Sequence, residues 1–223
     1  MESGRPTAVR VSPRATRVVA QFAQAGILRR RPRRLRTPSK RGLALIAERD
    51  IATIYGNYDY AIARDLDDCG CAYITPHDRE LGQRSVEWTL AHTDQASKEF
   101  MRDLPFDLHV PVGDRPLHLV HGPPRKVNEY LFEDKPARLY ERLAREEEPD
   151  VLVFGHTHKP WVHEFGGVLF VNCGSVGKPK DGDPRGAFAI LRPAASQVDV
   201  SSASPTTRSR SPAKSQRPGP FGG

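Results

Sequence analysis

The sequence has 223 residues, of which 38% are hydrophobic and 27% are charged, and its formal net charge is +7. This length suits one ordinary domain with additional segments. No apolar run reaches the roughly eighteen residues of a membrane span, and the beginning has no apolar signal stretch, so we expect a cytoplasmic protein without a membrane partner. The odd number of cysteines favours free thiols in a reducing compartment.

The positive charge is concentrated at the two ends of the chain. Residues 1–41 hold 12 Lys and Arg against one acid, and residues 192–223 hold five against one. The segment between them is net negative, so we do not expect the globular part to bind nucleic acid specifically. A non-specific nucleic-acid tether is one interpretation of the basic ends, and a solvated tail is the one that we prefer.

The first 41 residues form a basic, atypical or disordered segment without Asp or His. Its apolar residues Val18, Val19, Phe22 and Ile27 lie at roughly helical spacing, which predicts an amphipathic helix over about 16–28. An Arg-rich, acid-poor composition is also typical of an organelle transit peptide.

Residues 42–192 alternate between predicted helices and predicted strands, and we expect one domain there. The expected helices cover 40–50, 84–92, 93–105 and 135–147. Strands are expected over 51–57, 150–154 and 186–192, with hairpins that turn at Gly113-Asp114 and Gly166-Gly167. Residues 193–223 are rich in Ser, Pro, Arg and Gly, which predicts a disordered tail.

Polar residues of the kind that bind metals follow three of the apolar strands. "VLVFGHTHKP" sets His156 and His158 two positions apart after a buried strand, so both side chains point the same way in extended chain. "TIYGNYD" places Asn57 after a second strand, and "LHLVHGPP" places His121 after a third. The carboxyl ends of strands form the ligand crevices of α/β sheets, and imidazole is a common metal ligand. The sequence therefore predicts a metal site there, although a polar turn or loop explains each residue singly.

Other polar segments allow two interpretations each. "DLDDCGC", residues 65–71, is a second cation site or, as we prefer, an acidic loop over the cleft. Arg125 and Lys126 reach a substrate phosphate or lie in a solvated loop. "NCGSVGKPKDGDP", residues 172–184, presents backbone N–H groups to an anion or is a structural loop near the site. Five histidines have no ligand-like neighbours in the sequence, and we expect surface or half-buried side chains for them. They are His77, His92, His109, His118 and His163.

The motifs "GNYD", "HG", "GHTH" and "NCGS" occur in this order. In this the chain resembles the calcineurin-like metallophosphoesterase superfamily, in particular its small bacterial and archaeal single-domain members. The resemblance covers about residues 43–191. It implies an α/β fold of two stacked mixed β-sheets flanked by helices, with an atypical N-terminal part, and hydrolysis of phosphate mono- or diesters with two divalent ions.

By this resemblance, Asn57, His121 and His156 would hold one divalent ion, and His158 would hold the other. Mn, Fe, Ni and Zn are the candidate metals, since selectivity among them depends on supply as much as on ligands. Such a pair of ions activates water and holds the phosphoryl oxygens for in-line attack. The family has a catalytic histidine where this chain has Tyr58, a hydroxyl that donates a hydrogen bond but shuttles protons poorly at neutral pH. Asp59 would orient a ligand.

The family's Asp-x-His and Gly-Asp motifs are missing, because no Asp or His precedes Asp50. Those motifs supply the carboxylates that bridge the two ions, so one ion or none is expected here. The Arg/Pro/Ser/Ala bias of residues 1–41 resembles an out-of-frame translation of GC-rich DNA. We therefore hypothesise a frameshifted or mis-started segment, which reading the upstream DNA in its other frames would test.

These observations predict a metal-dependent phosphoesterase whose activity is impaired in this copy. The alternative is a catalytically inactive phosphoesterase-like protein that binds a phosphorylated ligand. In both cases the expected partner is a phosphate ester, and the sequence does not predict an oligomeric state.

Overall fold

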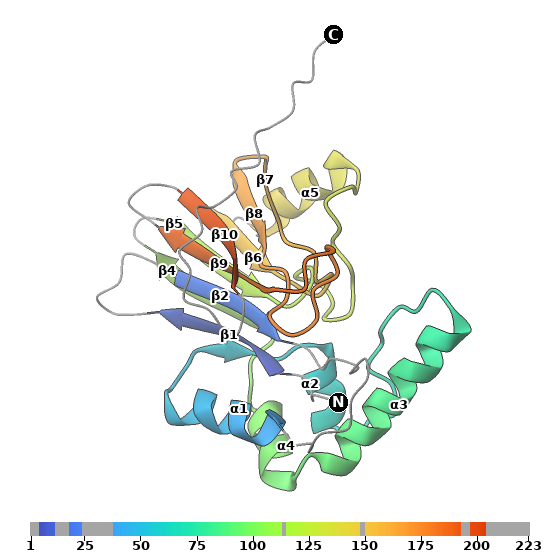
Figure 1. The fold of residues 1–223 in the computed structure, drawn as a ribbon. Helices are drawn as coiled ribbons and strands as arrows, with labels where there is room; N and C mark the ends of the chain where they lie inside the picture. The colour runs from blue at the N-terminus through green and yellow to red at the C-terminus, as the bar shows by residue number, and fades with distance from the viewer. Residues whose placement is uncertain are drawn as a thin grey trace.

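The computed structural model describes residues 5–11, 18–23, 38–112, 115–147, 150–192 and 197–203. Figure 1 shows two β-sheets and the helices around them. The first sheet has the strand order β10-β9-β2-β1-β3, and the second has the order β4-β5-β6-β8-β7. The predicted α/β class with two stacked sheets and flanking helices is confirmed.

The first sheet is antiparallel at each described pairing. Its strands are β1 (Arg5–Val11), β2 (Val18–Ala23), β3 (Thr53–Ile54), β9 (Gly186–Arg192) and β10 (Gln197–Ala203). The second sheet is mixed, because β5 and β8 both pair in parallel with β6. Its strands are β4 (Asp107–Val112), β5 (Arg115–Val120), β6 (Val151–Phe154), β7 (Trp161–Phe165) and β8 (Val168–Asn172). The two expected hairpins are β4–β5 and β7–β8.

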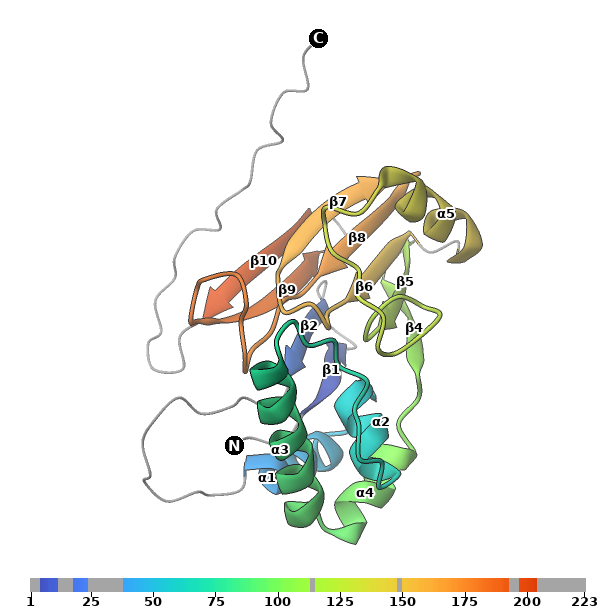
Figure 2. The same ribbon diagram turned by 90° about the vertical axis from the view of Figure 1, so that its right-hand side faces the viewer.

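The helices cover two parts of the molecule. α5 (Ala137–Glu147) packs on the outer face of the second sheet, whereas the other four helices gather at one end of the sandwich (Figures 1 and 2). They are α1 (Pro38–Glu48), α2 (Asn57–Ala63), α3 (Pro76–His92) and α4 (Gln95–Arg102). The side chains of Thr75 and Asp94 cap the first turns of α3 and α4 by accepting backbone N–H groups.

Apolar side chains form three clusters. The first fills the space between the sheets and includes Ile54, Leu117, Leu119, Val153 and Ala189. The second cluster lies between the second sheet and α5. The third cluster packs the four helices α1, α2, α3 and α4 against one another. Alternate residues of β5 therefore face opposite clusters, as expected for a strand that is covered on both sides.

Two predictions for the ends of the described chain are wrong. Within the helix expected over 16–28, the described residues Val18–Ala23 form strand β2, which pairs with both β1 and β9. Val and Phe suit a strand as well as a helix, and pairing across the sheet decides between them. In the expected disordered tail, Gln197–Ala203 form β10, which pairs with β9 along its whole length. No described helix is long and apolar enough to cross a membrane.

Candidate metal centre

The candidate ligands lie where several strands end. β5, β6 and β8 run in parallel, so their carboxyl ends meet at one edge of the second sheet. His121 follows β5, and the segment Gly155–His158 follows β6. β3 ends beside them in the other sheet, and Asn57 begins α2 just after it. The expected Gly-Asn turn is thus the start of a helix.

Asn57, His121 and His156 converge in a buried cluster. His121 Nε2 lies 3.0 Å from Asn57 Oδ1 and 3.0 Å from His156 Nδ1. Each of the three residues is buried. A single N–H can donate fully to only one of two acceptors, so His121 Nε2 does not form a full hydrogen bond with both atoms at once.

The orientation of Asn57 is fixed from behind. Its Nδ2 donates to the Cys69 carbonyl at 2.9 Å and to Cys71 Sγ at 3.1 Å, which turns Oδ1 towards His121. Gly56 allows His121 to approach, since a Cβ at Gly56 would lie 2.8 Å from His121 Cε1. The sequence did not indicate Cys69 and Cys71 as neighbours of the ligands, because that contact depends on how the loop before α3 folds.

Asp59 stands behind this turn rather than among the ligands. Its Oδ2 accepts the Gly56 N–H at 2.8 Å. Burial raises the pKa of Asp59 to about 7, and the Gly56 N–H opposes that rise. Its expected contribution is therefore to shape the turn that carries Asn57.

The loop after β6 has a strained backbone. His156 and His158 both have φ of 61°, in the left-handed region that non-glycine residues rarely adopt. Asn172 at the end of β8 holds this loop, donating to the Gly155 carbonyl at 3.1 Å and to Thr157 Oγ1 at 2.9 Å. Strain of this kind persists where the surroundings impose it, and it is common at functional sites.

Burial keeps the three histidines neutral at pH 7. Burial, helped by neighbouring Lys180, lowers the pKa of His156 to about 4 and that of His158 to about 3. Burial and the two other imidazoles hold the pKa of His121 well below its usual value. Neutral imidazole is the form that binds metals.

His158 lies beside this cluster with a defined tautomer. Its Nδ1 donates to the Lys178 carbonyl at 2.5 Å, so the other ring nitrogen, Nε2, keeps a free lone pair with which it can bind an ion. The Lys180 N–H donates to the His158 carbonyl at 3.0 Å. The loop between β8 and β9, which the sequence allowed as structural or anion-binding, therefore orients His158.

The candidate catalytic residue Tyr58 is largely buried in α2, where it packs in the cluster of α1 to α4 and lines the nearby cleft. Burial raises the pKa of the Tyr58 hydroxyl well above the ordinary value for tyrosine, and Cys69 contributes to the rise. Tyr58 therefore stays protonated at neutral pH and is a poor group for transferring a proton there.

Two other sequence candidates lie on exposed loops. Arg125 forms an ion pair with Glu129 at 3.0 Å. In the segment 65–71, Asp65 pairs with Lys98 and Arg102 of α4, while Cys71 lies against Asn57. This loop thus borders the site through its thiols rather than through its carboxylates.

The residues present suit a divalent transition ion. Two imidazoles and an amide oxygen form a mixed nitrogen and oxygen donor set for such ions. His121 Nε2 lies 3.0 Å from each of the other two ligand atoms, which is about the separation of adjacent ligands around an octahedral ion. No carboxylate or thiol of the described residues completes a group of three with His121 and His156. The roles of Asn57, His121, His156 and His158 as ligands stay predictions.

Known proteins resemble the part of the chain that carries this cluster. The protein MJ0912 of Methanocaldococcus jannaschii, described as uncharacterised, is 24% identical over an alignment of 166 residues, and the match covers 66% of this chain. The chain spans 62% of the length of that relative.

Two solved structures have a similar fold. The hypothetical protein PH1004 from Pyrococcus horikoshii has a TM-score of 0.62 at 22% identity, over 74% of this chain and 68% of its own. A metallophosphoesterase from Sphaerobacter thermophilus has a TM-score of 0.55 at 25% identity, over 72% of this chain and 69% of its own.

The sequence model of the calcineurin-like phosphoesterase superfamily domain matches residues 38–195. This match includes each of the strand ends that carry Asn57, His121, His156 and His158. The chain therefore belongs to the calcineurin-like phosphoesterase superfamily.

Proposed function

We propose that this chain is a metal-dependent phosphoesterase that holds one divalent ion through Asn57, His121 and His156. The observation that carries the proposal is that three buried residues, which follow the ends of separate strands, bring their ligand atoms together. His121 Nε2 lies 3.0 Å from the ligand atom of each of the other two. When bound, a divalent ion supplies Lewis acidity towards a phosphoryl oxygen and towards the attacking water. The substrate is a phosphate mono- or diester, and Mn²⁺ is the ion that we would supply first.

A cleft of about 350 Å³ adjoins the three ligands and would hold the ester. Cys71, Tyr130 and Lys178 line it and also contact the candidate ligands. Cys71 Sγ accepts from Asn57, the ring centroids of Tyr130 and His156 lie 4.1 Å apart, and the Lys178 carbonyl accepts from neighbouring His158. This volume is at the lower end for small-molecule sites, which favours a small ester over a folded macromolecule.

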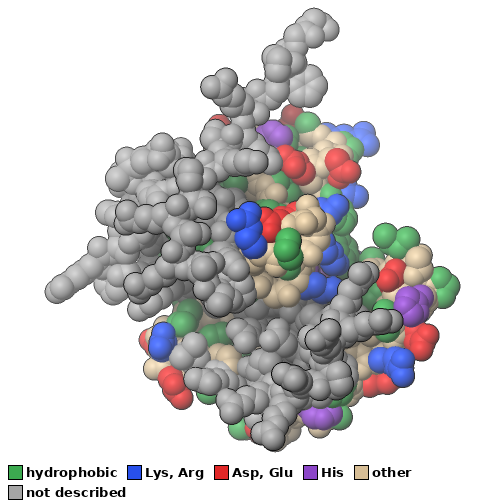
Figure 3. All heavy atoms as spheres, in the orientation of Figure 1, with side chains coloured by type: hydrophobic (Ala, Val, Ile, Leu, Met, Phe, Trp, Pro, Cys, Tyr) green, Lys and Arg blue, Asp and Glu red, His purple; other side chains and the backbone are tan. Residues whose placement is uncertain are grey.

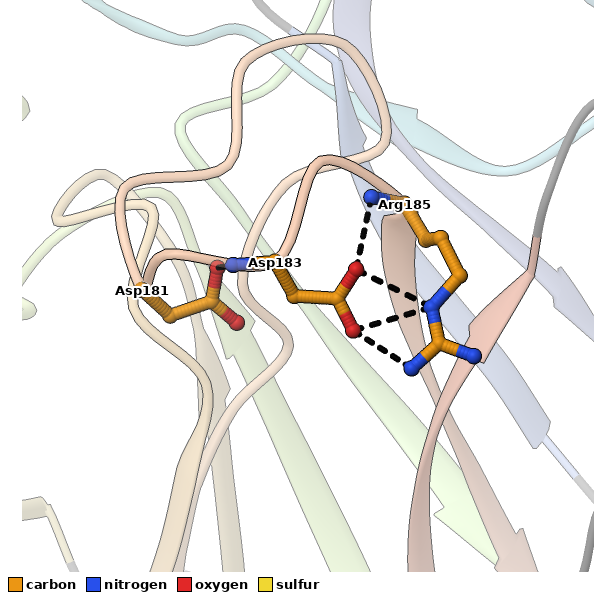
Figure 4. A network of polar contacts seen from close by, with 3 residues as sticks. All are labelled: Asp181, Asp183 and Arg185. Carbon is orange, nitrogen blue, oxygen red and sulfur yellow. Dashed lines mark hydrogen bonds and ion pairs between the residues drawn. The ribbon is translucent and has the colours of Figure 1, made fainter.

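Lys178 and Lys180 supply positive charge at the wall of this cleft. Figure 3 shows Lys and Arg side chains in the middle of this face, where Figure 1 places the loop between β8 and β9. The stem of that loop is braced by Asp183, whose carboxylate accepts from the Arg185 backbone and guanidinium (Figure 4). We assign the two ammonium groups to the substrate phosphate, which Lys binds as a point charge.

A second candidate function is ligand binding without turnover. It is favoured because no described carboxylate joins His121 and His156 in a group of three, and because Tyr58 is a poor proton donor. In that case the cleft and its lysines would bind a phosphorylated ligand, and the ester bond would stay intact.

Hydrolysis of an aryl phosphate diester with added Mn²⁺ distinguishes the two functions. We expect turnover in the wild type, its loss in H121A, and its retention in H163A, a control at an exposed histidine of β7. Binding of the ester without turnover in the wild type would support the second function. If the wild type neither binds nor hydrolyses the ester, both candidate functions are overturned.

A further inference from the structure

A second cluster of metal-ligating side chains lies on the β4–β5 hairpin. His109 pairs directly with His118 across the two strands, and Asp107 stands two residues before His109. Because side chains alternate along a strand, all three lie on the face opposite Leu117 and Leu119, which point into the core between the sheets. The sequence predicts surface or half-buried histidines without ligand-like neighbours here. His109 is exposed as predicted, but His118 is buried, and the cross-strand register gives it His109 and Asp107 as neighbours.

The three side chains point at one another. Asp107 Oδ2 lies 2.8 Å from His118 Nε2 and 3.6 Å from His109 Nε2. The two imidazole rings stack with their centroids 4.1 Å apart. One ligand atom from each residue lies within 4.8 Å of the other two. Of the described residues, this is the one group of three or more His, Cys, Asp or Glu that is close enough to share an ion.

We propose that Asp107, His109 and His118 bind a divalent transition-metal ion of the zinc type. Two imidazoles and one carboxylate are a donor set that Zn²⁺ adopts in proteins, whereas Mg²⁺ and Ca²⁺ prefer oxygen ligands. His118 is 3% exposed and Asp107 is 37% exposed, so the inner part of the site is already held in place. His109 is 67% exposed, and its ring can turn out of the stack to direct a lone pair at the shared ion.

An ion at this site would act as a clasp, a link that holds the outermost strand β4 to its neighbour β5. β4 lies at the edge of the second sheet, and β5 is its only neighbour in the described sheet (Figure 1). An ion held by both strands would fix their register, since a metal that binds only the folded state stabilises it. Asp107 pairs with Val120, the last residue of β5. The clasp would therefore also fix the strand end that carries His121.

The competing explanation needs no ion. The Asp107 carboxylate alone could orient the buried His118 ring, with His109 stacked on it. The two explanations differ in the part of His109. In the clasp it is a ligand, and its loss removes an ion, whereas in the stack its loss removes one ring contact.

Zinc titration calorimetry on the chelator-treated chain separates these explanations. We expect the wild type to bind one more equivalent of Zn²⁺ than H109A or D107N, and a hundredfold excess of Mg²⁺ to leave that equivalent in place. H77A, a change at an exposed histidine of α3, serves as the control and should match the wild type. His118 is left intact, because replacing so buried a side chain could unfold the hairpin.

A second measurement keeps this site separate from the centre around His156. Zn²⁺ should raise the midpoint of thermal unfolding of H156A by several degrees, and should not raise that of the double variant H109A/H156A. Equal zinc stoichiometry and affinity in wild type and H109A would overturn the proposal. Equal thermal shifts in the single and double variants would overturn it as well, whatever the outcome for the phosphoesterase activity.

Discussion

His121 and His156 are 35 positions apart in the chain, and their Nε2 and Nδ1 atoms lie 3.0 Å apart. They come from the ends of two adjacent parallel strands, β5 and β6. Because burial keeps both rings neutral, the pair is ready to share a cation without first losing protons. The proposed centre therefore follows from the parallel arrangement of β5 and β6 together with the burial of the residues at their carboxyl ends.

Asn172 is expected to position His156 without touching the ion. N172A removes two donated hydrogen bonds to the loop after β6 and one accepted from the Gly174 N–H. We expect the free energy of unfolding in EDTA to fall by about 2–3 kcal/mol, and metal affinity to fall by about 10- to 100-fold. Urea unfolding and metal titration measure the two effects, with Q95A on the surface of α4 as the control. Unchanged metal affinity in a folded N172A would show that the loop holds His156 without this clamp.

The family resemblance implies a catalytic histidine at the position of Tyr58, and the Tyr58 hydroxyl remains protonated at pH 7. Since it transfers no proton, Y58F should keep the rate of aryl diester hydrolysis within about threefold of the wild type. Y58H would place an imidazole there, as the family resemblance implies for this position, and general acid–base catalysis by such a group contributes about 10²- to 10⁴-fold. We therefore expect Y58H to be faster than wild type in kcat. A Y58F variant that loses the whole activity would contradict the role given to this hydroxyl.

Lys178 and Lys180 are expected to bind the phosphate of the ester. K178A removes the ammonium group with its aliphatic chain and leaves the backbone carbonyl that orients His158. We expect each of K178A and K180A to weaken binding of phenyl phosphate by about tenfold, with K135A near the start of α5 as a control. Fluorescence or calorimetric titration at two salt concentrations measures this effect. If both variants bind like the wild type, the phosphate lies elsewhere.

Tyr140 should make the fold sensitive to alkali. The ring is fully buried between Trp161, Phe165 and Phe170, and its hydroxyl donates to the Phe132 carbonyl. Burial raises the pKa of Tyr140 to about 12 from 10.0. A raised pKa means that the folded state prefers the protonated form. This contribution is therefore complete below pH 10 and is lost as the pH rises through 12.

The contribution of Tyr140 to the free energy of unfolding that is lost in this way is on the order of 1–3 kcal/mol. Urea unfolding from pH 8 to 12 should show the stability difference between wild type and Y140F shrinking above pH 10. A difference that stays constant over this range would mean that Tyr140 ionises equally well in both states.

Much of the second sheet could be predicted from the sequence. Short apolar runs bounded by Gly and Pro identify β5, β6 and β8, and the predicted helix over 135–147 makes β5 and β6 parallel. Once these strands are parallel, the residues after them share an edge, so the meeting of His121 with His156 follows. Asn57 was placed correctly at a strand end, although it starts a helix instead of a turn.

The hairpin cluster could also have been found from the sequence. A two-residue turn at Gly113-Asp114 places Val112 opposite Arg115, and counting outward places His109 opposite His118, as the structure shows. The immediate neighbours of each histidine along the chain are not ligands, so only the pairing across the two strands reveals this cluster.

The strands β2 and β10 depend on contacts that no local pattern contains. Val18–Ala23 carries apolar residues that fit either secondary structure, and pairing with β1 and β9 selects the strand. Gln197–Ala203 has a polar composition, and its seven pairs with β9 supply the backbone hydrogen bonds that make it a strand. Contributions of this kind come from the whole sheet, which is why propensity alone gives the wrong answer there.

The central claim is that Asn57, His121 and His156 hold a divalent ion. Elemental analysis tests it most directly in an H109A background, which removes the proposed hairpin site. The samples are H109A alone and H109A combined with H121A, H156A or the control H163A, each loaded with Mn²⁺ and dialysed. We predict one ion per chain in H109A and H109A/H163A, and none in H109A/H121A or H109A/H156A. Equal metal content in all four folded proteins would contradict the claim.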